Sequence, residues 1–116
     1  MKPLKRYCKI LELVDNPKLI AEYKRHHTPG AVWPEITEGT KSVGIREMEI
    51  YLSGTTLFMI METAPEFDHD SAMKRLAELP RQSEWEALMS KYQKSDPASS
   101  AKDKWRMMER IYTLNP

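Results

Sequence analysis

The chain lacks several features on which large classes of protein depend. Its 116 residues contain one cysteine, Cys8, so neither an internal disulfide nor a cysteine metal cluster can form. No apolar run approaches the roughly 20 residues that a membrane-spanning helix needs. Charged residues also follow the basic stretch 1–6 before a secretory apolar segment can develop. We therefore expect a cytoplasmic protein without a membrane anchor, in which Cys8 is a small apolar residue of a strand.

An excess of charge of either sign is also missing. Eighteen Lys and Arg residues balance seventeen Asp and Glu residues, for a formal net charge of +1. This balance provides no overall field toward nucleic acid or an anionic membrane, and it favours a neutral small molecule as partner.

Sequence signals for a metal or a cofactor are sparse. The three histidines show no ligand spacing beyond the adjacent pair His26 and His27, so we expect no metal site. There is no glycine-rich phosphate loop and no serine nucleophile elbow, so most enzyme classes that need a cofactor have no support in the sequence.

The residues that are present are typical of a single globular domain spanning 1–116. Apolar residues make up 41% of the chain and charged residues 30%, which suits one core. Hydrophobic periodicity, helix caps and turn residues predict the following elements. They are a strand Tyr7 to Val14, a helix Pro17 to about His27, a helix from Pro34 ended by Gly44, strands Ile45 to Leu52 and Thr56 to Thr63, a helix from about Asp68 to Leu79, a helix opened by a capping box at Ser83 to Glu86, a polar loop Ser95 to Ala101, and a strand Lys104 to Leu114.

The order of these elements predicts an α+β fold. Strand, helices, strand, strand, helices, strand is the ferredoxin-like split β-α-β pattern, with the helices on one face of the sheet. Charged residues within the strands indicate that the open face lines a polar pocket: Glu12, Glu49, Glu62, Glu109 and Arg110. A second copy of the chain would close this pocket, so we expect a homodimer that pairs sheet to sheet.

Tyr23 and His27 are the first candidates for chemistry. They lie one helical turn apart, so both side chains can reach one ligand from a rigid support. His27 is also near the helix C-terminus, where the helix dipole favours the imidazolium form and predicts a proton donor at neutral pH. The alternative is that both residues only complete the apolar row that begins at Leu19.

Trp33 and Glu35 follow closely, as Trp33-Pro34-Glu35. Aromatic rings pack on the apolar faces of sugars, and carboxylates bind hydroxyl groups or act as bases. Equally, Trp33 could anchor the core and Glu35 could be a favourable charge at a helix N-terminus. Tyr51, on the polar side of its strand, is balanced between site and surface, and the spacing of Trp85 favours the core.

Several separated motifs, in order, resemble the L-rhamnose mutarotase family from about Tyr7 to Leu114. They are Tyr23-x-x-x-His27, Trp33-Pro34-Glu35, Glu49-Ile50-Tyr51-Leu52, Leu57-Phe58 and Met108-Glu109-Arg110-Ile111-Tyr112. The link Thr28 to Val32 is longer than in the rhamnose enzymes, and Glu84-Trp85 replaces a Trp-Trp pair. Both differences bear on the identity of the sugar more than on the reaction.

The resemblance implies a dimeric α+β barrel that interconverts the α and β anomers of a deoxyhexose, such as L-rhamnose or L-fucose, without a cofactor. It implies catalytic roles for His27 and Tyr23, and from it we infer that Trp33, Glu35, Tyr51 and Trp85 bind the monosaccharide. Two other hypotheses remain open at this point. One is a sugar-binding or regulatory dimer without catalysis, and the other is a cofactor-independent monooxygenase, for which only the fold argues.

Overall fold

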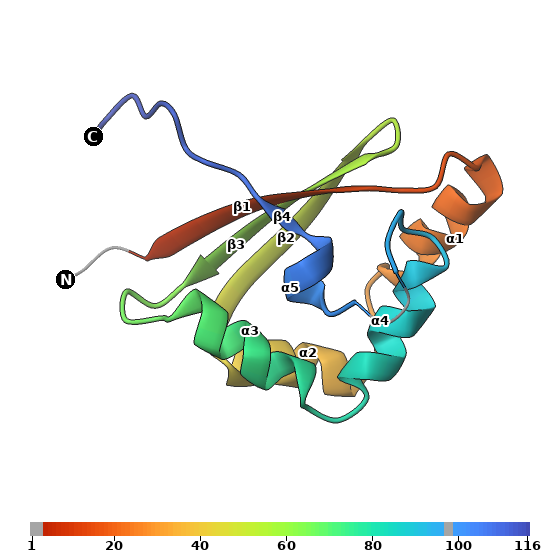
Figure 1. Ribbon diagram of the computed structural model, residues 1–116, viewed down its shortest axis with the longest axis horizontal. Helices are drawn as coiled ribbons and strands as arrows, with labels where there is room; N and C mark the ends of the chain where they lie inside the picture. Colours follow the sequence, from red (N-terminus) through yellow and green to blue (C-terminus); the bar gives the residue numbers. More distant parts are fainter. Residues whose placement is uncertain (1–3, 97–98) are drawn as a thin grey trace.

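The computed structural model describes residues 4–96 and 99–116, so Pro97 and Ala98 of the predicted polar loop lie outside the described residues. The elements follow one another along the chain as Figure 1 shows. They are β1 (Lys5–Glu12), α1 (Pro17–His26), α2 (Pro34–Ser42), β2 (Ile45–Ser53), β3 (Thr56–Thr63), α3 (His69–Ala77), α4 (Gln82–Ser90), α5 (Ala101–Lys104) and β4 (Arg106–Met107). None of the helices in the described part of the chain is long and apolar enough to cross a membrane.

The strands form one antiparallel sheet in the order β2-β3-β1-β4. The helices all lie on one side of this sheet, and the other side is open (Figure 1). This strand order, with helices on one face, confirms the predicted ferredoxin-like α+β fold.

Alternation along the strands determines which residues enter the core. In β3, Leu57, Met59 and Met61 are buried on the side that faces the helices, while Phe58 and Ile60 on the opposite side are only half-buried. In β1, Lys9 and Leu11 pair with Met59 and Leu57 and therefore share that buried face. The core accordingly lies between the sheet and the helical layer.

Local sequence explains most of the element boundaries. The side chain of Asn16 accepts hydrogen bonds from the backbone of Lys18 and Leu19 and so caps the start of α1. Gly54, in the turn between β2 and β3, has φ +60°, a conformation that side chains disfavour.

Gly39 is in the interior of α2, where glycine costs a helix roughly 1 kcal/mol relative to alanine. Its position is explained by packing, because an added Cβ would lie 3.3 Å from Leu79 Cδ1 and 3.7 Å from Leu76 Cδ1. The missing side chain lets α2 approach the end of α3 closely.

The predicted strand from Lys104 to Leu114 is largely wrong. Its first residue, Lys104, is the last residue of the short helix α5, and only Arg106 and Met107 pair with β1. After the hydrogen bond from Met108 N to Cys8 O the chain leaves the sheet, and Ile111 and Leu114 are 88% and 75% exposed. An alternating pattern describes a strand only where another strand offers hydrogen bonds, and among the described residues no strand pairs with the tail, residues 108–116, beyond the bond at Met108.

The predicted capping box at the start of α4 is also wrong. The N-cap is Arg81, two residues before Ser83, in a left-handed conformation with φ 63°, so the helix begins at Gln82, and no side chain caps it. Glu86 does not turn back to the backbone of Ser83. Instead its carboxylate is buried and binds two other side chains, Gln82 and Lys104.

Candidate active site

A cavity of about 390 Å³ lies between the sheet and the helical layer. Its size is within the usual range for sites that bind small molecules. The sequence had placed a polar pocket on the open face of the sheet, and the structure corrects this, because the cavity is on the helix-covered face. Three exposed charged residues among those that line it, Lys41, Arg46 and Glu47, mark its mouth between the end of α2 and the start of β2.

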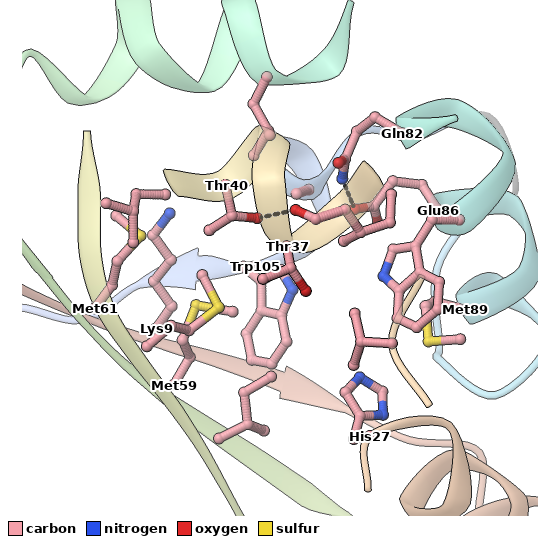
Figure 2. Close-up of a pocket in the computed structure, with 18 of the residues that line it drawn as sticks. Lys9, His27, Thr37, Thr40, Met59, Met61, Gln82, Glu86, Met89 and Trp105 are labelled. Atoms are coloured by element: carbon pink, nitrogen blue, oxygen red, sulfur yellow. Dashed lines mark hydrogen bonds between the residues drawn. The ribbon is translucent and has the colours of Figure 1, made fainter. Parts of the chain in front are cut away.

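The wall of the cavity combines a largely apolar surface with a few polar groups. Figure 2 shows Lys9, Met59 and Met61 reaching it from the sheet, Thr37 and Thr40 from α2, Gln82, Glu86 and Met89 from α4, and His27 from the end of α1. A mostly apolar surface with few, fixed polar groups is the usual construction of a small-molecule site.

His27 follows directly after the last residue of α1, and its imidazole is held in one orientation. Nδ1 lies 2.7 Å from the backbone carbonyl oxygen of Tyr23, so Nδ1 donates its proton there and Nε2 of the neutral ring is left with a free lone pair. The ring packs between two aromatic neighbours, 4.3 Å from the centroid of Tyr23 and 5.7 Å from that of Trp85. Among the described residues, Nε2 has no hydrogen-bond partner.

The charge expected for His27 from the helix dipole is wrong. Burial lowers the pKa of the imidazole below 6.5, and the neighbouring His26 lowers it further, whereas the hydrogen bond to the carbonyl of Tyr23 opposes both effects without reversing them. His27 is therefore a neutral base at neutral pH, with Nε2 as the atom that can accept a proton.

Tyr23 lines the same cavity and keeps its proton. Burial raises the pKa of its phenol to about 12. Gln93 Nε2 donates a hydrogen bond to the phenol oxygen at 3.4 Å, so the tyrosine O–H remains available as a donor. Tyr23 and His27 thus provide a proton donor and a proton acceptor one helical turn apart. Their spacing predicted that both side chains reach one place, but not these roles, since His27 was expected to be the donor.

Glu86 belongs to a buried polar network that the sequence reasoning missed. Lys104 Nζ, completely buried, lies 3.0 Å from Glu86 Oε1, and Gln82 Nε2 donates to Glu86 Oε2 at 2.8 Å. Both oxygens of the carboxylate are therefore occupied, and the network fixes one wall of the cavity. The sequence does contain a signal that these polar residues share one side of the helix and its continuation. The spacing is i, i+4, i+7 and i+11, for Gln82, Glu86, Met89 and Gln93.

Lys9 is the second residue that was missed. Its charge interrupts the apolar pattern of its strand, yet it is only 2% exposed and lines the cavity. The sequence does indicate that Lys9 is on the buried face of the strand, since it alternates in phase with Leu11 and Leu13, both of which are buried. Burial lowers the pKa of its amine from 10.5 to about 8.

The structure brings three of the six predicted site residues together and leaves three elsewhere. Tyr23, His27 and Trp85 line the cavity, whereas Trp33, Glu35 and Tyr51 do not.

The aromatic ring of Trp33 lies outside the cavity and packs against Trp85, which lines it. It packs edge-on against Trp85 with centroids 5.2 Å apart, and the Arg81 guanidinium lies 4.0 Å from its centroid on the other side. Glu35 is paired with the same arginine at 3.5 Å and is partly exposed. Tyr51 is on the open face of the sheet, 51% exposed, and donates a hydrogen bond to Glu49.

Comparison with known proteins places these features in a family. The model of the L-rhamnose mutarotase family matches residues 6–114. The L-fucose mutarotase of Xanthomonas campestris pv. campestris is 41% identical over 112 residues, which is 97% of this chain and 90% of that protein. A UPF0734 protein of Dictyostelium discoideum is 39% identical, covering 96% of this chain and 90% of that protein.

A solved structure supports the fold independently. The crystal structure of an L-rhamnose mutarotase from Formosa agariphila matches with a TM-score of 0.71, covering 96% of this chain and 99% of that one. The two sequences are 19% identical, so this match speaks for the fold alone. From the family match and the L-fucose mutarotase relative, the chain belongs to the L-rhamnose mutarotase family, carbohydrate isomerases that interconvert the α and β anomers of sugars.

Proposed function

We propose that this chain catalyses the mutarotation of L-fucose in the cavity between sheet and helices, with His27 as general acid/base and Tyr23 as its proton-donating partner. The observation that carries the proposal is the orientation of His27. Its Nδ1 is held by the Tyr23 carbonyl oxygen, and its Nε2 is free in a ring that lines the cavity.

Mutarotation requires two proton transfers. Nε2 of His27 takes the proton of the anomeric hydroxyl while the Tyr23 O–H protonates the ring oxygen, so that the bond between the anomeric carbon and the ring oxygen breaks and the open aldehyde forms. After rotation of the aldehyde, ring closure on its other face returns both protons to their original groups. Acid/base catalysis of this kind contributes about 10²- to 10⁴-fold.

Trp85, in contact with His27, is the aromatic surface we assign to the sugar ring. Trp33 and Glu35 lie outside the cavity, so we propose that Trp33 positions Trp85 and that Glu35 helps to hold Arg81 over Trp33. Tyr51 lies on the open face of the sheet, so we propose that it contacts the second subunit and does not bind the sugar.

One observation favours L-fucose over L-rhamnose. The relative that is 41% identical is named for L-fucose. Both sugars carry a methyl group at carbon 6. The methionines of the cavity, Met59 and Met61 among them, offer this methyl group an apolar and adaptable surface.

We further propose that the enzyme is a cytoplasmic homodimer. Its one cysteine is free, which suits a reducing compartment. The open face of the sheet carries half-buried apolar residues such as Cys8, Ile10, Phe58 and Ile60, and the exposed tail adds Ile111. A second copy of the chain is a partner with a matching surface for this face.

Saturation transfer between the anomeric protons in NMR tests the reaction and the substrate together. We expect the enzyme to accelerate exchange in L-fucose more than in L-rhamnose, and a D-glucose control to exchange at its uncatalysed rate. Faster exchange in L-rhamnose than in L-fucose would overturn the substrate assignment. Binding of either sugar without faster exchange would overturn catalysis and favour the binding-module alternative.

A further inference from the structure

The cavity is lined by a buried lysine whose ammonium group forms no hydrogen bond in the described part of the chain. Lys9 is 2% exposed, and among the described residues no hydrogen bond or ion pair holds its ammonium group, although the charge of Asp70 acts on it and raises its pKa against the effect of burial. Its neighbours on the same buried face of the sheet include Met59, directly opposite in the register, and Met61. Figure 2 shows the amine end of Lys9 beside the methionines, on the cavity side of the sheet.

A second buried lysine in the same protein shows what a structural lysine looks like here. Lys104 is also fully buried, and it is satisfied by the carboxylate and the backbone carbonyl of Glu86. A buried charge without such partners costs free energy that a methionine of similar length would not. Packing therefore does not explain why a lysine occupies position 9. The cavity that its side chain faces does explain it.

A buried acceptor without a partner lines the same cavity. Gln93 is 4% exposed, and its Nε2 donates to the Tyr23 phenol, but its Oε1 has no hydrogen-bond partner. Buried polar atoms are nearly always paired, so an orphan acceptor beside a cavity indicates a ligand that carries donors. Gln93 forms an isolated bridge with Leu13, just beyond the end of β1, whereas Lys9 lies within β1, so the two side chains reach the cavity from different parts of its wall.

We infer that Lys9 and Gln93 bind the hydroxyl groups of the sugar from two sides of the cavity. Lys9 Nζ donates to one or two sugar oxygens, and Gln93 Oε1 accepts from a hydroxyl of the same sugar. The ligand class that satisfies both is a neutral polyol ring, since each hydroxyl both donates and accepts. This inference rests on the proposed function and adds to it the residues that hold the sugar away from the reacting carbon.

The test is the variant Lys9→Met, with Lys18→Met as a matched control. Lys18 is exposed at the start of α1, so its replacement removes the same charge outside the cavity. A hydrogen bond to a charged group is worth about 10- to 100-fold in binding, so we expect the KM of Lys9→Met for L-fucose to rise by that factor. We expect its kcat to change much less, its Tm to rise, and Lys18→Met to match the wild type in KM.

A KM for Lys9→Met within twofold of the wild type, or a lower Tm without a change in KM, would overturn the inference and leave Lys9 a structural residue. If Lys9→Met does not fold, Lys9→Gln and Gln93→Met provide the same comparison of KM with kcat. Unchanged KM values in both variants would also overturn the inference.

Sugar binding measured directly by ligand-observed NMR separates this test from the proposed function. Wild-type binding without anomer exchange would remove the catalytic proposal, while weaker binding by Lys9→Met would still support Lys9 as a sugar ligand.

Discussion

The imidazole of His27 combines a fixed orientation with a lowered basicity. The carbonyl oxygen of Tyr23 holds Nδ1, two aromatic rings hold the plane, and burial lowers the pKa of the ring below 6.5. Such a group is uncharged throughout the neutral range. It therefore acts as a base toward an anomeric hydroxyl without first having to lose a proton.

The lowered pKa of His27 predicts the acid limb of the pH profile. A group whose pKa is lowered keeps its neutral, active form as the pH falls through 6.5, and loses it only at the lower folded pKa. We expect kcat/KM for L-fucose to stay level from pH 7.5 down to 6.5 and to decline below 6.5. The measurement is anomer exchange across pH 4.5 to 8, with circular dichroism at each pH to show that the fold persists. A loss of activity centred above pH 6.5 would contradict a neutral, desolvated His27.

At the scale of elements, the ion pair between Lys104 and Glu86 ties α5 to α4. Removing one partner of a buried pair leaves the other charge uncompensated, which typically costs about 3–5 kcal/mol. We therefore expect Lys104→Met to lower the free energy of unfolding by about that amount in urea denaturation.

The double variant Lys104→Met with Glu86→Met is the control for this prediction. Because it removes both charges together, it should recover most of the lost stability. A loss in the double variant equal to the sum of the losses in Lys104→Met and Glu86→Met alone would show that the pair contributes no coupling, and that α5 is held by its apolar contacts instead.

Local patterns were sufficient to predict the sheet and most of the helices. The alternation of β3, the Asn16 cap and the Gly54 turn each act over a few residues, so the sequence displays them directly. The tail was predicted as a strand because its residues alternate equally well. Whether an alternating segment is a strand depends on a partner strand, which is a property of the whole fold.

The candidate site divides in the same way. Tyr23 and His27 could be predicted because helical spacing places them together without knowledge of other elements. The pairing of Lys104 with Glu86 joins residues 18 positions apart, and no local pattern reports it. The charge of His27 was predicted wrongly because the helix dipole is visible in the sequence, whereas the aromatic rings that bury the imidazole come partly from α4.

At the scale of the whole molecule, the open sheet face and the tail are the surfaces that a single chain leaves uncovered. The tail exposes Ile111, Tyr112 and Leu114, and Figure 1 shows it leading away from the body of the protein. Large apolar side chains in such a position suit contact with a second subunit.

This surface predicts that the tail contributes to dimer formation. We expect the full chain to be a dimer in light scattering coupled to size-exclusion chromatography, and a chain that ends at Met107 to be a monomer or a much weaker dimer. The triple variant Ile111→Ser, Tyr112→Ser and Leu114→Ser keeps the chain length and should behave like the truncated chain. A full-length monomer would contradict the proposed dimer, and a truncated chain that remains dimeric would confine the interface to the sheet.

The central claim is that anomer exchange takes place in the cavity and depends on His27, and saturation-transfer NMR of L-fucose with His27→Gln tests it most directly. Glutamine retains a side-chain amide that can bind the Tyr23 carbonyl, but it cannot accept and return a proton. We predict that the exchange rate of this variant falls by about 10²- to 10⁴-fold while its thermal unfolding remains cooperative. Exchange at the wild-type rate in a folded His27→Gln variant would contradict the account.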